Sequence, residues 1–299
     1  MIHIRPSLLK ERFGGAQPNI SQQIIQNAGV AIPPLSEQRA IASLLSKIQT
    51  AVEVQDKIVA KLKELKAATM VKLFREGLRG EPLKQTAIRE IPESWEVMLL
   101  NSIADLVSGG TPSKSRPEWW QGSIPWASPK DMKCPRLNDT QDHVSEEAIE
   151  YGSRLVPAKT IFVVIRGMIL AKDLPVAITQ VPMAFNQDMK AVLARDAVDP
   201  EYLLYAIGSR KEALVQEIGT SAHGTRRMGT SSLEALLIPV PQKEQQIRIA
   251  AALRTIEQRE DAASRTHGHL SFLFSSTLHL LMTGQVRANH LNNNKETDG

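Results

Sequence analysis

Cationic side chains in glycine-bearing loops are the residues of this sequence whose types and spacing are most suited to binding an anionic ligand. The stretch 221–228, Ser-Ala-His-Gly-Thr-Arg-Arg-Met, is polar and contains two adjacent arginines, and other cations follow a Gly-Gly-Thr-Pro-Ser turn and a Pro-Trp pair. The planar fork of arginine matches a guanine edge or a phosphate, so these patterns favour contact with nucleic acid. For each cation taken singly, an ordinary solvated loop is the alternative. The predicted DNA-binding residues are Lys114, Arg116, Lys130, Lys133, His223, Thr225, Arg226 and Arg227.

A catalytic centre is the main rival interpretation of the same region. Glu118, Asp131 and Lys133 imitate the spacing of a metal-dependent nuclease, in which carboxylates hold Mg²⁺ and a lysine assists the attacking water. Their segment is rich in proline and tryptophan and lacks strands that would aim them. The motifs GxxxxGK[ST], GxGxxG and HExxH are absent, and the single Cys134 excludes a CxxC zinc site. The sequence therefore predicts no catalytic residue, no metal site and no cofactor of its own, with a metal-dependent DNA nuclease as the alternative.

The distribution of charge limits how the chain would bind a nucleic acid. The chain has 36 basic and 32 acidic residues, which gives a net charge of +4. Residues 90–240 contain 15 basic and 19 acidic side chains, and 15 − 19 gives −4. A mildly acidic segment does not coat nucleic acid nonspecifically, so local clusters of cations must make any contact with phosphates.

Two long helices are predicted on either side of these loops. Ile32-Pro-Pro and Ile238-Pro-Val-Pro each precede a long segment with apolar residues at heptad-like spacing, and the two segments keep the same phase. Prolines before the first turn, together with Gly77 and Gly284 after the last, are typical signals for the start and end of a helix. A small domain cannot bury two such stripes, so we expect the helices to pack against each other in antiparallel fashion. The predicted helix-packing residues are Leu45, Ile48, Val52, Val59, Leu62, Leu253, Ile256, Leu270 and Phe274.

Polar residues interrupt both apolar stripes. Gln55, Lys66, Glu260 and His267 occupy stripe positions, where they either fix the register of the helices or mark where packing stops. His267 and His269 point to different sides of a helix, so no metal site is expected from this pair.

The segment between the helices is predicted to form one mixed globular domain. Residues 160–165 and 190–193 resemble strands, and residues 200–207 begin like a short helix. All four tryptophans lie within residues 95–126, where packing in the domain is favoured over base stacking. The predicted fold class is α+β, with one mixed α/β domain flanked by two long helices that form an antiparallel coiled coil.

Several motifs together resemble the specificity (S) subunits of type I restriction–modification systems. The motifs are Gly109-Gly-Thr-Pro-Ser113, Gly122-Ser-Ile-Pro-Trp126, Ile165-Arg-Gly167, Phe185-Asn-Gln187 and the Ile238-Pro-Val-Pro-Gln-Lys-Glu-Gln245 that begins the second long helix. They occur in the family's order, and residues 14–20 are similar to the end of a preceding target recognition domain. The resemblance covers nearly the whole chain.

The resemblance implies a division of labour between subunits. The globular domain resembles a target recognition domain, which reads one half of a split DNA sequence. The helices resemble the conserved spacers that dock methyltransferase (M) subunits. Chains of this family have no catalytic centre, because adenine methylation with S-adenosylmethionine and ATP-driven cleavage belong to the M and restriction (R) subunits. The cofactors S-adenosylmethionine, ATP and Mg²⁺ would therefore bind to those partners, whose assembled complex acts as a type I site-specific deoxyribonuclease and adenine methyltransferase.

The resemblance also suggests boundaries along the chain. The expected parts are a remnant of the end of a first target recognition domain (1–31), a conserved spacer helix (32–80), a linker (81–91), the target recognition domain (92–240), a second conserved spacer helix (241–287) and a disordered tail (288–299). A complete family member has two recognition domains, whereas this sequence has one. It is either a half-type subunit that forms a homodimer or pairs with another partial S subunit, or an inactive remnant or recombination cassette of an S-subunit gene.

The sequence predicts no contact with a membrane. The first residues, Met1–Pro6, lack the basic-then-apolar build of a signal peptide. The longest apolar stretch, Ile161–Ala171, contains Arg166 and is far shorter than the roughly 20 residues that a membrane helix needs. The expected location is the cytoplasm.

Overall fold

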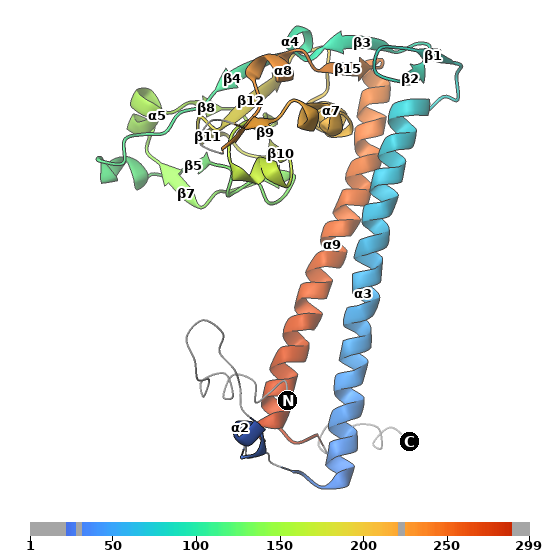
Figure 1. Ribbon diagram of the computed structural model, residues 1–299, viewed down its shortest axis with the longest axis vertical. Helices are drawn as coiled ribbons and strands as arrows, with labels where there is room; N and C mark the ends of the chain where they lie inside the picture. The colour runs from blue at the N-terminus through green and yellow to red at the C-terminus, as the bar shows by residue number, and fades with distance from the viewer. Residues whose placement is uncertain (1–21, 28–31, 221–224, 289–299) are drawn as a thin grey trace. The chain divides into compact units, whose positions relative to one another are not determined.

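The computed structural model describes residues 22–27, 32–220 and 225–288 of the chain. The chain divides into two compact units, one made of residues 1–64 and 257–299 and the other of residues 65–256. The long helices α3 (Leu35–Glu76) and α9 (Lys243–Met282) contribute to both units (Figure 1). Apart from these helices, the described part of the first unit has the short helix α2 (Gln22–Gln26), and every described strand lies in the second unit.

In the first unit, α3 and α9 lie side by side and run antiparallel (Figure 1). Glu37, near the start of α3, lies 3.1 Å from Arg287, which follows the end of α9, and Asp56 in the middle of α3 lies 3.0 Å from His267 of α9. Positions further along α3 thus meet positions earlier in the C-terminal segment, as antiparallel helices require. The predicted antiparallel coiled coil is therefore confirmed. The ion pair of His267 with Asp56 supports a role of this polar stripe residue in the register of the two helices.

The nine predicted helix-packing residues all lie on the covered face of their helix. Ile48 and Leu253 are buried, and the other seven are half-buried. Exposed charges such as Glu53, Lys57 and Lys63 occupy other faces of α3. Half-burial is what a pair of helices provides, because each helix covers its partner on one side only.

Prolines and glycines set the ends of the long helices. Pro34 directly precedes α3, whose first turn contains Glu37, and Pro241 lies two residues before α9. Gly77 and Gly284 follow the last turns with φ values of +64° and +72°, in the left-handed region that favours glycine. Both helices are shorter than the predicted spans 32–80 and 241–287. The prolines and glycines end the helical hydrogen bonding inside those spans, and the residues beyond them form extended and turn segments.

The second unit contains two larger sheets. The five-stranded sheet has the order β4-β12-β9-β10-β6, in which only the β10–β6 pair is parallel. Its strands are β4 (Ala104–Ser108), β6 (Arg136–Leu137), β9 (Ile161–Val164), β10 (Val176–Thr179) and β12 (Met189–Ala194). The four-stranded sheet has the order β7-β5-β11-β8, with strands β5 (Ile124–Ala127), β7 (Asp142–Val144), β8 (Leu155–Val156) and β11 (Met183–Phe185). Strands β9 and β12 confirm the two strands predicted from the sequence.

Shorter elements complete the second unit. Three two-stranded pairs are β1 (Leu83–Gln85) with β2 (Glu90–Pro92), β15 (Leu237–Val240) with β3 (Glu96–Leu99), and β13 (Gly219–Thr220) with β14 (Arg226–Arg227). The α-helices are α4 (Leu100–Ile103), α5 (Glu146–Gly152), α6 (Pro200–Ser209), α7 (Lys211–Gln216) and α8 (Thr230–Glu234), and the 3₁₀ turns are η1 (Pro117–Trp120) and η2 (Met168–Ala171). Helix α6 confirms the helix start predicted at 200, and the Asp199 carboxylate caps it by accepting a bond from the Tyr202 amide.

The core of the second unit incorporates the adjoining turns of both long helices. Trp95 is fully buried, and its indole Nε1 donates a hydrogen bond to Gln245 of α9 at 3.0 Å. Phe74 of α3 is also fully buried and lies 5.5 Å from the ring of Tyr202. The end of α3 and the start of α9 therefore belong to the same hydrophobic core as the sheets.

The predicted linker, residues 81–91, forms a structured hairpin instead. Strands β1 and β2 pair antiparallel, with Lys84 opposite Ile91, and the side chain of Ile91 is fully buried. The Glu81 carboxylate also accepts a hydrogen bond from the Ser94 amide. The segment shows little alternation of polar and apolar residues, so its strands depend on burial of Ile91 against the domain core.

The two predicted end segments lie largely outside the described residues. The described part of 1–31 is confined to α2 and Asn27. In the predicted tail 288–299, only Ala288 is described, and it is buried. Among the helices that the structure describes, none is both long and apolar enough to cross a membrane.

Replacing Tyr202 by phenylalanine is expected to lower the free energy of unfolding by about 1–3 kcal/mol. The buried Tyr202 hydroxyl donates to the Pro239 carbonyl at 2.6 Å, which would lose its donor. Burial raises the pKa of Tyr202 well above its ordinary 10.0, so the stabilisation is complete below pH 10 and is lost as pH rises through the raised pKa. Urea unfolding near neutral pH and above pH 10 measures both effects. The stability gap between the two proteins should narrow at the higher pH, and equal stability near neutral pH would contradict the prediction.

Candidate nucleic-acid interface

The motifs Gly109–Ser113 and Phe185–Gln187 meet through very close backbone contact. The Gly110 amide donates to the Phe185 carbonyl at 2.9 Å. A Cβ atom at Gly109 would lie 2.2 Å from the same carbonyl oxygen, which no real side chain tolerates. The Thr111 hydroxyl donates to the Gln187 side-chain oxygen at 2.5 Å. Glycine at these positions is therefore required by the approach of two backbones.

The motif Gly122–Trp126 joins the same cluster through β5. The Trp126 indole donates to the Gly110 carbonyl at 3.0 Å, and the Asn186 amide donates to the Ala127 carbonyl at 2.9 Å. A Cβ at Gly122 would lie 2.0 Å from the carbonyl oxygen of Val144 on the next strand, β7. Trp119 and Trp126 are buried in a small hydrophobic cluster, in agreement with the predicted packing role.

The motif Ile165–Gly167 connects this cluster to the predicted reading loop. The amides of Ile165 and Arg166 both donate to the Asp188 carbonyl, at 2.8 and 3.1 Å. Gly167, with φ +133°, donates its amide to the Arg226 carbonyl at 3.0 Å. Three motifs that are far apart in the sequence thus surround the fourth, at residues 185–188, and we call this assembly the motif cluster.

The hairpin β13–β14 carries the two predicted arginines and rests on the motif cluster. Gly219 pairs with Arg227 within the hairpin, and Arg227 also forms an isolated antiparallel bridge with Arg166. The Arg226 side chain is half-buried and that of Arg227 is exposed, and neither forms an ion pair with any residue that the structure describes. Backbone bonds therefore hold the hairpin, and neither guanidinium group is needed for an ion pair with the described part of the chain.

The structure describes only part of the remaining predicted loop. Thr225 is half-buried beside β14, and His223 lies outside the described residues. Arg166 is half-exposed and lies 3.8 Å from Asp188, so the two side chains form a loose ion pair at the surface. The structure adds Arg166 to Arg226 and Arg227 as a third cation on adjoining backbone segments, and the sequence signal for it was an arginine that interrupts an apolar strand.

Lys114 and Arg116 lie on the exposed segment that leaves the motif cluster. Lys114 forms no ion pair with a described residue. The Arg116 guanidinium lies 4.9 Å from the ring of Trp119, in a cation–π contact that orients it. The exposed ring of Tyr151 stacks on the same tryptophan at 6.1 Å.

Lys130 and Lys133 belong to a separate loop that follows β5. They line a shallow hollow of about 450 Å³, and Lys130 forms an ion pair with Asp142 at 2.6 Å. Lys133 is exposed. The charge of Lys130 is therefore already offset by Asp142, whereas Arg226 and Arg227 form no ion pair with a described residue.

The residues of the nuclease alternative do not form a metal centre in the described part of the chain. The Asp131 carboxylate accepts bonds from the amide and hydroxyl of Ser128 and from the Gln141 amide, at 2.9–3.0 Å. It therefore holds the loop in place. Glu118 lies on η1 and is exposed. Among the described residues, no group of three or more His, Cys, Asp or Glu side chains could hold a metal ion.

The described chain combines a mixed α/β unit, which carries the arginine hairpin, with two long antiparallel helices. A sequence profile of the type I restriction modification DNA specificity domain matches residues 1–64 and 92–265. The chain belongs to this family of type I restriction–modification specificity proteins.

Individual relatives agree with this assignment. The EcoR124I/EcoR124II specificity subunit of Escherichia coli is 34% identical over 204 residues, which are 68% of this chain and 50% of that protein. The MjaVIII specificity subunit of Methanocaldococcus jannaschii is 24% identical over 310 aligned positions, covering 97% of this chain and 70% of the relative. The chain thus spans about half the length of the Escherichia coli protein.

Solved structures share the fold. The HsdS subunit from Thermoanaerobacter tengcongensis matches with a TM-score of 0.52 and 17% identity, over 95% of this chain and 68% of that one. The type I S subunit from M. genitalium matches with a TM-score of 0.64 and 15% identity, over 94% and 70% of the two chains. The combination of a mixed α/β domain with long helices is therefore the fold of this family.

Replacing Gly109 by alanine is expected to lower the free energy of unfolding by about 1–3 kcal/mol. The added methyl group would meet the carbonyl oxygens of Phe185 and Asn186 at 2.2 and 2.6 Å. Gly268→Ala is the matched control, because nothing lies within 4 Å of its Cβ position inside α9. That control should be neutral or stabilising by up to about 1 kcal/mol. Chemical denaturation compares the two variants, and equal stabilities would contradict the close approach at the motif cluster.

Proposed function

We propose that this chain is a DNA sequence-recognition subunit that directs type I methyltransferase and restriction subunits to a bipartite DNA target. The observation that carries the proposal is the β13–β14 hairpin, whose Arg226 and Arg227 form no ion pair with a described residue and lie on a backbone held by the motif cluster. Arginine forks on a fixed backbone suit bidentate contact with guanine or with a phosphate. Family membership supports the same function.

The coiled coil would supply the scaffold on which the partners assemble. On this proposal, S-adenosylmethionine, ATP and Mg²⁺ bind to the methyltransferase and restriction subunits and not to this chain, which binds double-stranded DNA. The complex would work in the cytoplasm. Lys114 and Arg116 are proposed to add phosphate contacts beside the hairpin, because phosphate contacts set the position of a protein on DNA.

A bipartite target requires two reading domains, and the sequence predicts one, residues 92–240. We propose that two copies of this chain, or this chain and another partial S subunit, supply the two domains in the assembled complex. Two identical domains related by a twofold axis would read an inverted repeat, because the symmetry of the protein is mirrored in the DNA.

The composition of the assembled complex tests the proposed function. The chain is co-expressed with a cognate methyltransferase subunit, and the mass of the complex is measured by light scattering with and without DNA. Two copies per complex support a self-paired reader with a symmetric target. A single copy in an active complex assigns the second half-site to another subunit. Failure of the chain to join any methyltransferase complex would contradict the proposed function and favour an inactive remnant.

A further inference from the structure

The segment directly after β9 pairs with β14 and extends the β13–β14 hairpin by a third antiparallel segment. The Gly167 amide donates to the Arg226 carbonyl at 3.0 Å, and the Met228 amide donates to the Ile165 carbonyl at 2.9 Å. These two bonds enclose one residue on each side. Such a pair is of the non-hydrogen-bonded kind, whose side chains lie closer together than those of a hydrogen-bonded pair.

Arg166 and Arg227 are the enclosed pair, directly opposite each other in an antiparallel bridge. Directly opposite residues point to the same face, with their Cβ atoms about 4.5–5.5 Å apart. Both arginines are exposed, whereas Ile165 and Met228, which belong to the other face, are buried. The two guanidinium groups therefore share the outward face of this small sheet.

Arg226 belongs to the opposite face from Arg227, because side chains alternate along a strand. It is half-buried, and the residue across from it is Gly167, which has no side chain. The two arginines that are adjacent in the sequence thus have different surroundings, and only Arg227 lies beside Arg166.

The outward pair of like charges has little compensation within the described chain. Asp188 lies 3.8 Å from Arg166 in a loose ion pair, and Arg227 forms no ion pair with a described residue. Like charges that are directly opposite each other destabilise an antiparallel pair. A bound anion would remove this repulsion, so the pair is better suited to a ligand than to the stability of the free chain.

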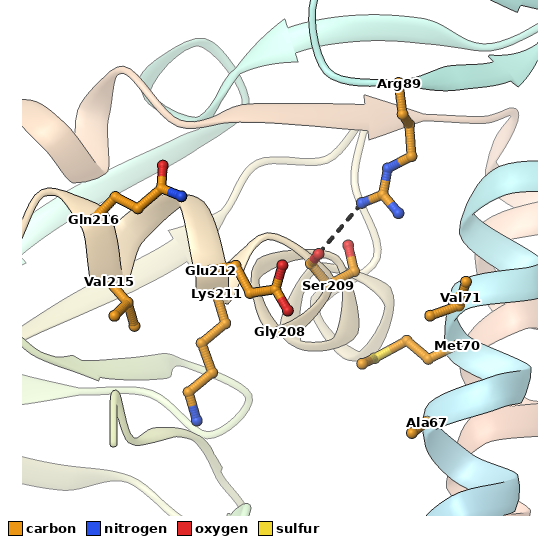
Figure 2. Close-up of a pocket in the computed structure, with 10 residues that line it drawn as sticks. All are labelled: Ala67, Met70, Val71, Arg89, Gly208, Ser209, Lys211, Glu212, Val215 and Gln216. Carbon is orange, nitrogen blue, oxygen red and sulfur yellow. Dashed lines mark hydrogen bonds between the residues drawn. The ribbon is translucent and has the colours of Figure 1, made fainter. Parts of the chain in front are cut away.

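Other arginines of the second unit have closer partners within the chain. The Arg195 guanidinium lies 2.7 Å from the Asp105 carboxylate, although both side chains are about half exposed. Arg89 donates to the Ser209 carbonyl at 3.3 Å (Figure 2). Exposure alone therefore does not explain why the outward pair on the hairpin is so weakly compensated.

We propose that Arg166 and Arg227 form a clamp for a single phosphodiester group of double-stranded DNA. The inference rests on the proposed function, because it takes DNA as the ligand. A phosphodiester has one negative charge on two non-bridging oxygens, so it can accept from both guanidinium groups and offset their repulsion. A guanine edge is neutral and accepts from one arginine fork, so it would leave the repulsion in place. The clamp thus positions the hairpin, and Arg226 remains the arginine for base contact.

A carboxylate of a partner subunit is the other anion that two arginines could bind. The clamp shares its hairpin with Arg226, however, and every base edge in DNA is flanked by phosphates. A phosphate is therefore the anion that the proposed function brings to this face. DNA binding and subunit assembly respond differently to the two ligands.

The salt dependence of binding counts the phosphates that the clamp neutralises. Arg166→Gln with Arg227→Gln is compared with the wild-type chain in the assembled methyltransferase complex, on a target selected from a random DNA pool and on non-target DNA. The slope of log affinity against log salt concentration should become shallower by about 0.9, the value for one phosphate of B-DNA. Both affinities should fall by the same factor, because phosphates carry no sequence information. An unchanged slope, or a change of about 1.8 from two separate phosphates, would overturn the clamp.

A neutral phosphate analogue tests whether the two arginines share one group. A single methylphosphonate replaces each phosphate of the target duplex in turn. At one position the wild-type complex should bind about tenfold more weakly, and the double variant should bind the modified and unmodified duplexes equally. Absence of any position with this pattern would overturn the proposal.

Thermal unfolding of the free chain separates a binding role from a structural one. The double variant should unfold at the wild-type temperature or higher, because the repulsion between the arginines is relieved. A lower midpoint would assign the pair to the stability of the fold and overturn the clamp. Lys159→Gln is the control, since this exposed lysine forms no ion pair with a described residue, and it should keep the wild-type salt slope.

The failure of the clamp and the failure of the proposed function give different results. Weaker assembly of the double variant with the methyltransferase subunit, with a wild-type salt slope on DNA, would make a carboxylate the ligand. That result would overturn the clamp and leave the proposed function intact. If the wild-type complex itself selects no DNA sequence, the proposed function fails, and the clamp fails with it.

Discussion

Replacing both Arg226 and Arg227 by alanine is expected to lower the ratio of target to non-target DNA affinity by about 10- to 100-fold. The two side chains form no ion pair with a described residue, so the chain loses no internal partner when they are removed. The hairpin itself depends on backbone bonds, such as the one from the Gly167 amide to the Arg226 carbonyl, which alanine preserves. Specificity should therefore fall while the free energy of unfolding stays within about 0.5 kcal/mol of the wild-type value.

The salt dependence of binding separates two roles for these arginines. The target is first selected from a random DNA pool with the assembled methyltransferase complex, and affinities are then titrated over a range of salt concentrations. Lost specificity indicates base contact. A shallower salt slope with specificity retained would make both arginines phosphate contacts and would contradict a reading role. Full affinity and full specificity in the double variant would show that another surface reads the DNA. Lys159→Ala serves as the control for loss of an exposed cation.

Replacing Trp95 by alanine is expected to lower the free energy of unfolding by about 3–5 kcal/mol. The side chain is fully buried where the end of α3, the start of α9 and the sheets share one core. Its removal leaves a cavity and takes the donor from Gln245, whose side chain is also buried. Gly77, at the end of α3, packs against the same indole ring, so the last turn of that helix should loosen as well.

Urea unfolding measures this effect against two comparisons. Trp95→Phe keeps most of the buried volume and loses the hydrogen bond, so its cost should be about 1–3 kcal/mol. Trp120→Ala removes a half-buried tryptophan that contacts the edge of Trp126 at 5.0 Å, and its cost should be smaller than that of Trp95→Ala. Equal losses for Trp95→Ala and Trp120→Ala would contradict the view that Trp95 joins the helices to the domain core.

Local patterns explain the parts of the fold that could be predicted. The heptad spacing of residues such as Leu45 and Ile48 repeats over many turns, so a single long helix and its covered face follow from the sequence. The strands at β9 and β12 follow from short apolar runs in the same way. The hairpin at 81–91 was missed because Ile91 is one apolar residue in a polar segment, and its burial depends on a core assembled from distant parts of the chain.

In the candidate site too, residue types could be interpreted from the sequence, whereas the neighbours of each charge depend on the tertiary structure. The residue types of Arg226 and Arg227 indicated a cationic loop, but their uncompensated charge depends on which carboxylates the fold brings near. Lys130 belonged to the same predicted set, yet Asp142 on the next strand offsets its charge. The proximity of Arg89 and Arg210, whose charges interact, had no sequence signal, because 121 positions separate the two residues in the chain.

The amino-acid sequence was enough to predict the α+β class, the two long helices with their packing faces, and the family resemblance that the comparisons bear out. These features depend on periodicity and on short motifs, which act over a few turns or a few residues. Only the folded chain shows that the motifs at Gly109, Gly122 and Ile165 surround residues 185–188, and that Arg226 and Arg227 form no ion pair with a described residue. Backbone approach and charge compensation depend on contacts between residues far apart in the chain, and no local pattern specifies those contacts.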